Sequence, residues 1–177
     1  MTQAIFAICE GLNAPVSEAA ARKLSDCRRG DLTEALFIAG CIVYDWEIFK
    51  AFGHDHTADW VLVRGNLRLT VQVKTACLER GEYCIPTKRG RGPTQRPYAA
   101  GDFDILAAYL PDRNQFVFWS FEDIRGRQKV RYSPARHRQP GNWNLLDEVA
   151  ESLTANQKPF IAWDSQCPTP HCTFVHI

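Results

Sequence analysis

Two strand-like runs joined by the dipeptide Gly65-Asn66 constrain the fold of this chain more than any other feature. A two-residue turn at this dipeptide fixes an antiparallel register in which Asp59 lies opposite Gln72. Lys74 follows two residues later, so its side chain points to the same surface of the predicted hairpin. The apolar residues of the two runs fall on the other surface: Trp60, Leu62, Leu67, Leu69, Val71 and Val73. The register that buries the apolar residues therefore also gathers three polar ones.

These three polar side chains carry the groups that hydrolysis of a phosphodiester needs. Magnesium and similar hard cations prefer carboxylate and amide oxygens, which Asp59 and Gln72 supply. The ammonium group of Lys74 can stabilise the pentacovalent phosphorane or orient the attacking water. The pattern alone supports a structural interpretation equally well, in which Asp59 ends a loop and the other two residues lie on the solvent face of an amphipathic strand.

Composition places the chain among ordinary globular proteins with a local excess of positive charge. Its 177 residues, 45% of them apolar, predict one domain over residues 1–177. The net charge of +1 hides a cluster of cations between residues 86 and 138. Seven cysteines, an odd number, favour a reducing compartment, and no segment fits a signal peptide or a membrane span. The sequence therefore predicts a cytoplasmic protein with no membrane partner.

Periodicity and turn residues predict the remaining elements. Two helices are expected, one over residues 15–27 and a largely buried one after Gly30, with Asp31 as its N-cap. The sequence further predicts an edge strand at 47–50, strands at 103–109 and 116–119, and a helix at 145–153. Residues 88–97 are rich in Gly, Pro and Arg without periodicity, which indicates an exposed mobile loop.

Three segments that occur in order carry a resemblance to a known family. They are Gly30-Asp31-Leu32-Thr33-Glu34 at the start of a helix, Thr57-Ala58-Asp59-Trp60, and Val71-Gln72-Val73-Lys74-Thr75-Ala76. Together they resemble the PD-(D/E)XK nuclease superfamily, and within it the endonucleases associated with group I introns. The resemblance covers about residues 28–124, because the segment from Asp102 to Pro111 is similar to the later strand of that family. This range includes a mobile basic loop at about 86–98, and a C-terminal extension at about 125–177 follows it.

The resemblance implies an α/β fold with a restriction-endonuclease-like core, in which helices flank a central mixed sheet. It implies a homing-type DNA endonuclease that needs Mg2+, with Mn2+ as a substitute, and that hydrolyses phosphodiester bonds with a metal-activated water. Two positions depart from the family's pattern. Ala58 replaces a proline, which matters little, and Gln72 replaces the usual acid, which removes a negative charge and weakens the expected metal affinity.

The resemblance also implies a role for each matched residue. Asp59 is the central metal ligand, Gln72 is a neutral ligand or positions the water, and Val73 contributes its backbone carbonyl. Lys74 stabilises the developing charge. Glu34 matches the helix-borne acid of the family and can restore the carboxylate that is lost at position 72.

Several further candidates have weaker support. The spacing Asp31-x-x-Glu34 is also that of a capping box, so Glu34 has a structural interpretation that can coexist with the catalytic one. His54 and His56 precede Asp59 and can shuttle a proton, although loop histidines are more often bystanders. Four residues near the C-terminus lack the paired spacing of common zinc sites: Cys167, His171, Cys172 and His176.

The candidate DNA contacts are four cations of the glycine-rich loop: Lys88, Arg89, Arg91 and Arg96. The loop follows the hairpin directly and can overhang the proposed site, although a solvated charge run is the alternative. A second basic run over 125–138 can extend the contact surface.

The way this kind of site cuts DNA bears on assembly. One site cuts one strand, so double-strand cleavage implies a homo-oligomer, either a dimer or a tetramer. The same core also serves Holliday-junction resolvases and restriction-type nucleases, and it can persist as a catalytically inactive DNA-binding module. The sequence does not separate these alternatives.

Overall fold

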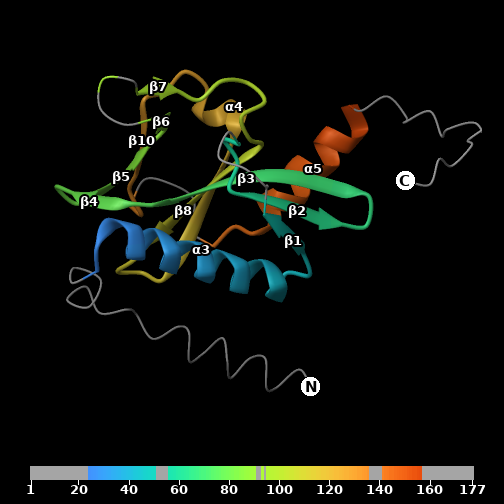
Figure 1. Cartoon of the computed structure of the whole chain (residues 1–177), viewed down its shortest axis with the longest axis horizontal. Helices are drawn as coiled ribbons and strands as arrows, with labels where there is room; N and C mark the ends of the chain where they lie inside the picture. The colour runs from blue at the N-terminus through green and yellow to red at the C-terminus, as the bar shows by residue number, and fades with distance from the viewer. Residues whose placement is uncertain (1–23, 51–55, 91–92, 94, 136–140, 157–177) are drawn as a thin grey trace, which may run out of the picture.

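A five-stranded mixed sheet lies at the centre of the structure, a computed structural model that describes residues 24–50, 56–90, 93, 95–135 and 141–156 (Figure 1). Its strand order is β1-β2-β3-β8-β9, with β3 and β8 parallel and every other neighbouring pair antiparallel. The strands are β1 (Glu47–Lys50), β2 (Trp60–Arg64), β3 (Leu67–Thr75), β8 (Ile105–Leu110) and β9 (Gln115–Ser120). Helices flank this sheet, so the predicted α/β fold with a central mixed sheet is confirmed.

The hairpin of β2 and β3 has the register that its turn predicts. Gly65 has a φ of +61°, which glycine adopts without strain in a two-residue turn. At the far end of the hairpin, Trp60 pairs with Val71. Just before this pair, the amide of Asp59 also donates to the Val71 carbonyl, at 2.9 Å, and the Asp59 carboxylate accepts a hydrogen bond from the Gln72 side chain.

Helix α3 (Asp26–Val43) begins earlier than the sequence pattern predicted. Its N-cap is Ser25, whose hydroxyl accepts a hydrogen bond from the Arg28 amide at 3.4 Å, so the expected cap at Asp31 is wrong. Asp31 and Glu34 lie inside the helix, beyond the first turn whose free amides a capping box would satisfy. The capping-box interpretation of Glu34 is therefore wrong as well.

Packing explains why α3 continues through Gly30. Glycine inside a helix costs about 0.5–1 kcal/mol relative to alanine, and burial of the following turns offsets this cost. Three buried residues at four-residue spacing face the sheet: Thr33, Phe37 and Cys41. Residues 24–27 lead into α3 and form its start, although they were expected to end a separate helix that begins at residue 15. The first part of that expected helix, residues 15–23, lies outside the described residues.

Helix α5 (Asn144–Asn156), expected at 145–153, shares a hydrophobic core with α3 and one face of the sheet. Trp143, just before α5, stacks on Tyr44 with 4.8 Å between the ring centroids. The same indole packs against Phe118 and lies over Gly40 of α3. Within the described residues, no helix is long and apolar enough to cross a membrane.

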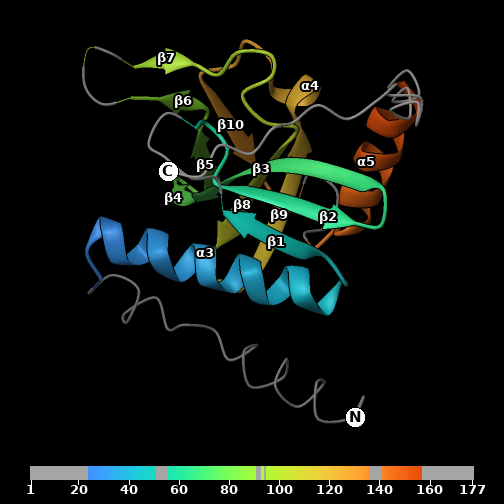
Figure 2. The same cartoon turned by 45° about the vertical axis from the view of Figure 1, so that its right-hand side comes forward.

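Three short strands that the sequence did not predict form a second sheet in the order β10-β5-β4: β4 (Cys77–Glu79), β5 (Glu82–Pro86) and β10 (Lys129–Tyr132). This sheet and α4 (Phe121–Ile124) share a second hydrophobic core with the other face of the central sheet. The ends of the expected basic loop pair as a ribbon, β6 (Lys88–Arg89) and β7 (Arg96–Pro97). Figures 1 and 2 both show this ribbon and α4 on the side of the molecule away from α3. β4, β6 and β7 have only two or three residues each, too few alternating positions for a pattern to stand out in the sequence.

Strand β8 is buried at all six positions because both faces of the sheet are covered. Alternate residues from Ile105 belong to the core beneath α3 and α5, and alternate residues from Leu106 belong to the core beneath the second sheet. A strand that is covered on both faces has an unbroken apolar sequence, as ILAAYL is. The neighbouring strand β3 pairs with β8 and contributes Leu69, Val71 and Val73 to the core beneath the helices.

Replacement of two glycines of α3 by alanine should have opposite effects on stability. A Cβ at Gly40 would lie 2.3 Å from Cη2 of the stacked Trp143, so Gly40→Ala should lower the free energy of unfolding by about 1–3 kcal/mol. Nothing lies within 4 Å of a Cβ at Gly30, so Gly30→Ala should raise it by about 0.5–1 kcal/mol. Urea denaturation followed by circular dichroism measures both changes. Stabilisation by Gly40→Ala would contradict the position of Trp143.

Candidate active site

The three polar residues of the hairpin lie just before the start of β2 and in the second half of β3. The Asp59 Oδ2 atom accepts hydrogen bonds from the Val73 amide at 2.7 Å and from Nε2 of Gln72. The side chain of Gln72 is only 5% exposed, which excludes the interpretation that it lies on a solvent face. Lys74 is half-buried two residues further along β3. The geometry therefore brings Asp59, Gln72 and Val73 into direct contact.

A neighbouring loop fixes the segment that carries Asp59 into the hairpin. The Thr57 hydroxyl donates to the Asp102 carbonyl at 2.7 Å. Ala58 packs against the second core, next to the buried residues beneath the small sheet. These contacts hold the backbone just before Asp59 against the loop that leads into β8.

Burial governs the ionisation of Asp59. Desolvation raises the pKa of its carboxyl group above the ordinary value, and the charge of Glu34 acts in the same direction. The hydrogen bond from the Val73 amide and the positive charges of Lys74 and Lys50 lower the pKa, but they do not cancel the effect of burial. The charged carboxylate is therefore held at a cost in free energy, which a cation bound beside it would relieve.

The donor set of this site fits a divalent cation. Nε2 of Gln72 donates both to Asp59 Oδ2 and to the Val73 carbonyl oxygen, the latter at 3.3 Å. The partly positive amide group thus lies between a carboxylate and a carbonyl, two oxygen types that hard cations prefer. Rotation of the amide by half a turn would present Oε1 of Gln72 in place of Nε2. Asp59, Val73 and Gln72 can then offer three oxygens to one cation.

Lys74 lies beside an aromatic residue that the sequence did not single out. Its Nζ atom is 5.9 Å from the ring centroid of Tyr98, which follows β7 directly. Tyr98 is 8% exposed and packs edge-on against Phe103, with 4.8 Å between the ring centroids. The only sequence signal for this residue is its place at the end of the basic segment.

The structure places Glu34 beside the three residues rather than among them. Its Oε2 atom is 3.3 Å from Nζ of Lys50, and Nζ is also 4.9 Å from the ring centroid of Trp60. Within the described residues, no group of three His, Cys, Asp or Glu side chains could hold a metal ion. Glu34 acts on Asp59 through its charge. Nothing in the sequence pointed to Lys50 beyond its place at the end of an expected edge strand.

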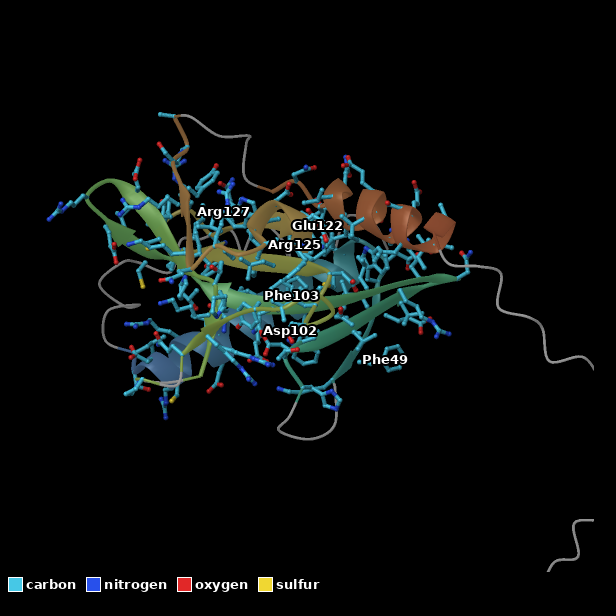
Figure 3. All side chains as sticks on the ribbon, turned by 90° about the horizontal axis from the view of Figure 1, so that it is seen from above. Phe49, Asp102, Phe103, Glu122, Arg125 and Arg127 are labelled. Carbon is cyan, nitrogen blue, oxygen red and sulfur yellow. The ribbon has the colours of Figure 1, made fainter. Side chains whose placement is uncertain are left out.

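The cations predicted to contact DNA differ in their solvent exposure and in whether they are already paired with an acid. Arg96 is exposed, whereas Lys88 is partly covered. Arg89 is paired with Asp102, at 3.4 Å. Asp102 lies on the loop before β8 and is labelled in Figure 3. The Asp102 carboxylate also accepts a hydrogen bond from the Ala99 amide at 2.7 Å, so Arg89 is bound to a fixed acid. Arg91 lies outside the described residues.

The structure describes the weaker candidates only in part. His56 is exposed three residues before Asp59, and His54 lies outside the described residues. The possible zinc ligands at Cys167, His171, Cys172 and His176 also lie outside them, as do parts of the second basic run at 125–138.

The fold and the site define the class of this protein, which is an α/β protein with a restriction-endonuclease-like core. The family model for the PD-(D/E)XK endonuclease matches residues 24–150, and the chain belongs to this family, so it is a nuclease. Its fold is similar to that of a bacterial homing endonuclease, I-Ssp6803I. That match has a TM-score of 0.61 and 21% sequence identity, and it covers 76% of this chain and 99% of the other. No curated protein matches the chain.

Replacement of Asp59 by asparagine should stabilise the metal-free protein. The raised pKa means that the folded state binds a proton more tightly than the unfolded state, so stability falls as pH rises through the interval between the two pKa values. The amide introduced by Asp59→Asn mimics the protonated acid and removes that loss. In EDTA, the urea midpoint of Asp59→Asn should match that of the parent well below pH 3.8 and exceed it at neutral pH. A lower midpoint at neutral pH would show that the hydrogen bonds outweigh the cost of burial.

Proposed function

We propose that this protein is a homing-type DNA endonuclease that depends on a divalent cation, with Mg2+ as the natural ion and Mn2+ as a substitute. One observation supports this most directly: the Gln72 amide lies between the Asp59 carboxylate and the Val73 carbonyl. A cation that replaced the amide hydrogens would meet hard oxygen ligands and an undersolvated acid. Nucleases of this family typically use divalent metals.

Each residue of the site would contribute through a different group. Asp59 supplies the charged ligand, the Val73 carbonyl and the Gln72 amide supply neutral ligands, and Glu34 is an additional acid beside them. When bound, the cation would activate the attacking water and neutralise charge on the phosphate. Lys74 would hold its ammonium group against the phosphate oxygens, where negative charge grows in the transition state. The contact with Tyr98 limits the positions that this ammonium can take.

The β6–β7 ribbon would place DNA against this site. Tyr98 connects the ribbon to Lys74, so a duplex that contacts the ribbon lies close to the catalytic groups. Arg96 and Lys88 would contact phosphates directly, together with Arg91. Arg89 would join them only when a phosphate displaces Asp102 from its guanidinium.

The number of copies in the active assembly and the location of the protein are proposed from two different observations. One site cuts one strand, so double-strand cleavage requires a second copy, and we propose a dimer or a tetramer of a single-domain chain. The described cysteines are unpaired thiols, which supports the cytoplasm as its location: Cys27, Cys41, Cys77 and Cys84.

Lys74→Met should abolish cleavage and leave binding nearly intact. Loss of the ammonium removes stabilisation of the transition state, so we expect kcat to fall by a factor on the order of 100 or more. Plasmid nicking and linearisation in Mg2+ measure cleavage, and fluorescence anisotropy measures DNA affinity. Arg68→Met is the matched control, because Arg68 is an exposed cation on the same strand. Full cleavage by Lys74→Met, or intact DNA with the parent despite tight binding, would overturn the proposal.

Gln72→Glu should make stability more dependent on the cation. A second buried carboxylate beside Asp59 loses the hydrogen bond from the amide and adds like charge, so the protein in EDTA should lose about 1–3 kcal/mol of stability. Mg2+ should restore this loss, because two carboxylates bind the cation more tightly than one. Thermal unfolding in EDTA and in Mg2+ gives the comparison. A Mg2+-induced rise in Tm no larger than that of the parent would contradict a cation at this position.

A further inference from the structure

Lys50 lies beside the proposed metal site without a role in it. It is the last residue of the edge strand β1, where it pairs with Trp60 of β2. Since Trp60 directly follows Asp59, this pairing brings Lys50 to the end of the sheet that carries the site. Its ammonium is 3.3 Å from Glu34 Oε2 and 4.9 Å from the ring centroid of Trp60. The aromatic face and the acid together hold Lys50 at this position.

The pair of Lys50 and Glu34 is electrostatically connected to the site. Both charges act on the pKa of Asp59, in opposite directions, so both lie close enough to influence a ligand at that carboxylate. Of the pair, Glu34 is the more enclosed, with 30% of its side chain exposed, while Lys50 is 65% exposed. Glu34 on α3 is therefore the more constrained partner, while the long and exposed side chain of Lys50 can move to other positions.

The exposure of Lys50 makes this ion pair easy to exchange. Ion pairs in contact with water contribute little to stability, because solvent screens the attraction and two flexible side chains lose freedom. A divalent cation beside Asp59 would attract the Glu34 carboxylate more strongly than one ammonium does and would repel that ammonium. Lys50 would then be released next to the site, where its ammonium could contact a phosphate bound there.

We propose that Lys50 is a phosphate-contacting residue whose ammonium stays on Glu34 until a divalent cation takes that carboxylate. The inference rests on the proposed function, because it assumes a cation beside Asp59. It predicts that Lys50 competes with the cation in the free protein and contributes to DNA binding once the cation is present. The same exchange would make the DNA contact of Lys50 conditional on a loaded metal site.

Metal affinity tests the first half of the inference. Mn2+ binding to the DNA-free protein, followed by electron paramagnetic resonance, should become about threefold tighter in Lys50→Met. In the Glu34→Gln background the same substitution should change Mn2+ affinity much less, because the competition acts through Glu34. Lys50→Arg should retain most of the competition of the parent. An equal gain in both backgrounds would show only a general effect of charge and would overturn the inference.

DNA affinity tests the second half. Anisotropy titrations in the Lys74→Met background, which keeps the DNA intact, should show about threefold weaker binding for Lys50→Met in Mn2+ and little change in EDTA. Arg68→Met controls for the loss of a positive charge from the same sheet, and its effect should not depend on Mn2+. Equal losses in Mn2+ and EDTA would overturn the inference while leaving the proposed function intact. If Mn2+ binds Asp59→Asn as well as the parent, the proposed function fails and the inference fails with it.

Discussion

The hydrogen bonds that meet at Asp59 Oδ2 hold the functional end of this molecule together. The Val73 amide and the Gln72 side chain both donate to this oxygen, which joins the segment entering β2 to the second half of β3. Each donor is buried or partly buried, and a buried donor without a partner costs about 1–3 kcal/mol. The backbone pairing of the hairpin and these side-chain contacts depend on the same register. A slip by one residue would therefore separate the acid from the amide and turn the apolar side chains of both strands away from the core.

Burial of the residues around Asp59 determines how this carboxyl group ionises and how much it would gain from a bound cation. β8 contributes residues to both cores, and its neighbour β3 contributes Leu69, Val71 and Val73 to the core beneath the helices, while Gln72 of β3 is itself buried. Burial raises the pKa of Asp59 and increases the benefit of a bound cation. A neutral amide next to this carboxylate limits the buried negative charge to one group, which the metal-free fold can tolerate. Two buried acids at the same place would repel each other until a cation arrived.

One loop joins the candidate active site to the β6–β7 ribbon. The Asp102 carboxylate pairs with Arg89 of the ribbon, and its carbonyl accepts from Thr57, two residues before Asp59. Tyr98 makes a second connection, because it follows the ribbon in the chain and its ring lies beside Lys74. Charges of opposite sign alternate around this end of the sheet, so a bound cation and a bound phosphate would each find a partner. The family match accounts for the framework, and these contacts connect that framework to the ribbon.

The sequence by itself determined the hairpin, its register and the meeting of Asp59 with Gln72, because a two-residue turn and a period of two leave one alignment that buries the apolar residues. It also indicated α3, α5 and the other strands of the central sheet, from the spacing of their apolar residues and the turn residues between them. Only the tertiary structure decided where α3 begins, that short strands form a second sheet, and that Glu34 pairs with Lys50. These features depend on packing against residues that are distant in the chain, and a local sequence pattern does not show which distant residues will pack together. The burial of Gln72 belongs to the same group, since alternation along a strand does not tell whether its polar face is covered by other parts of the chain.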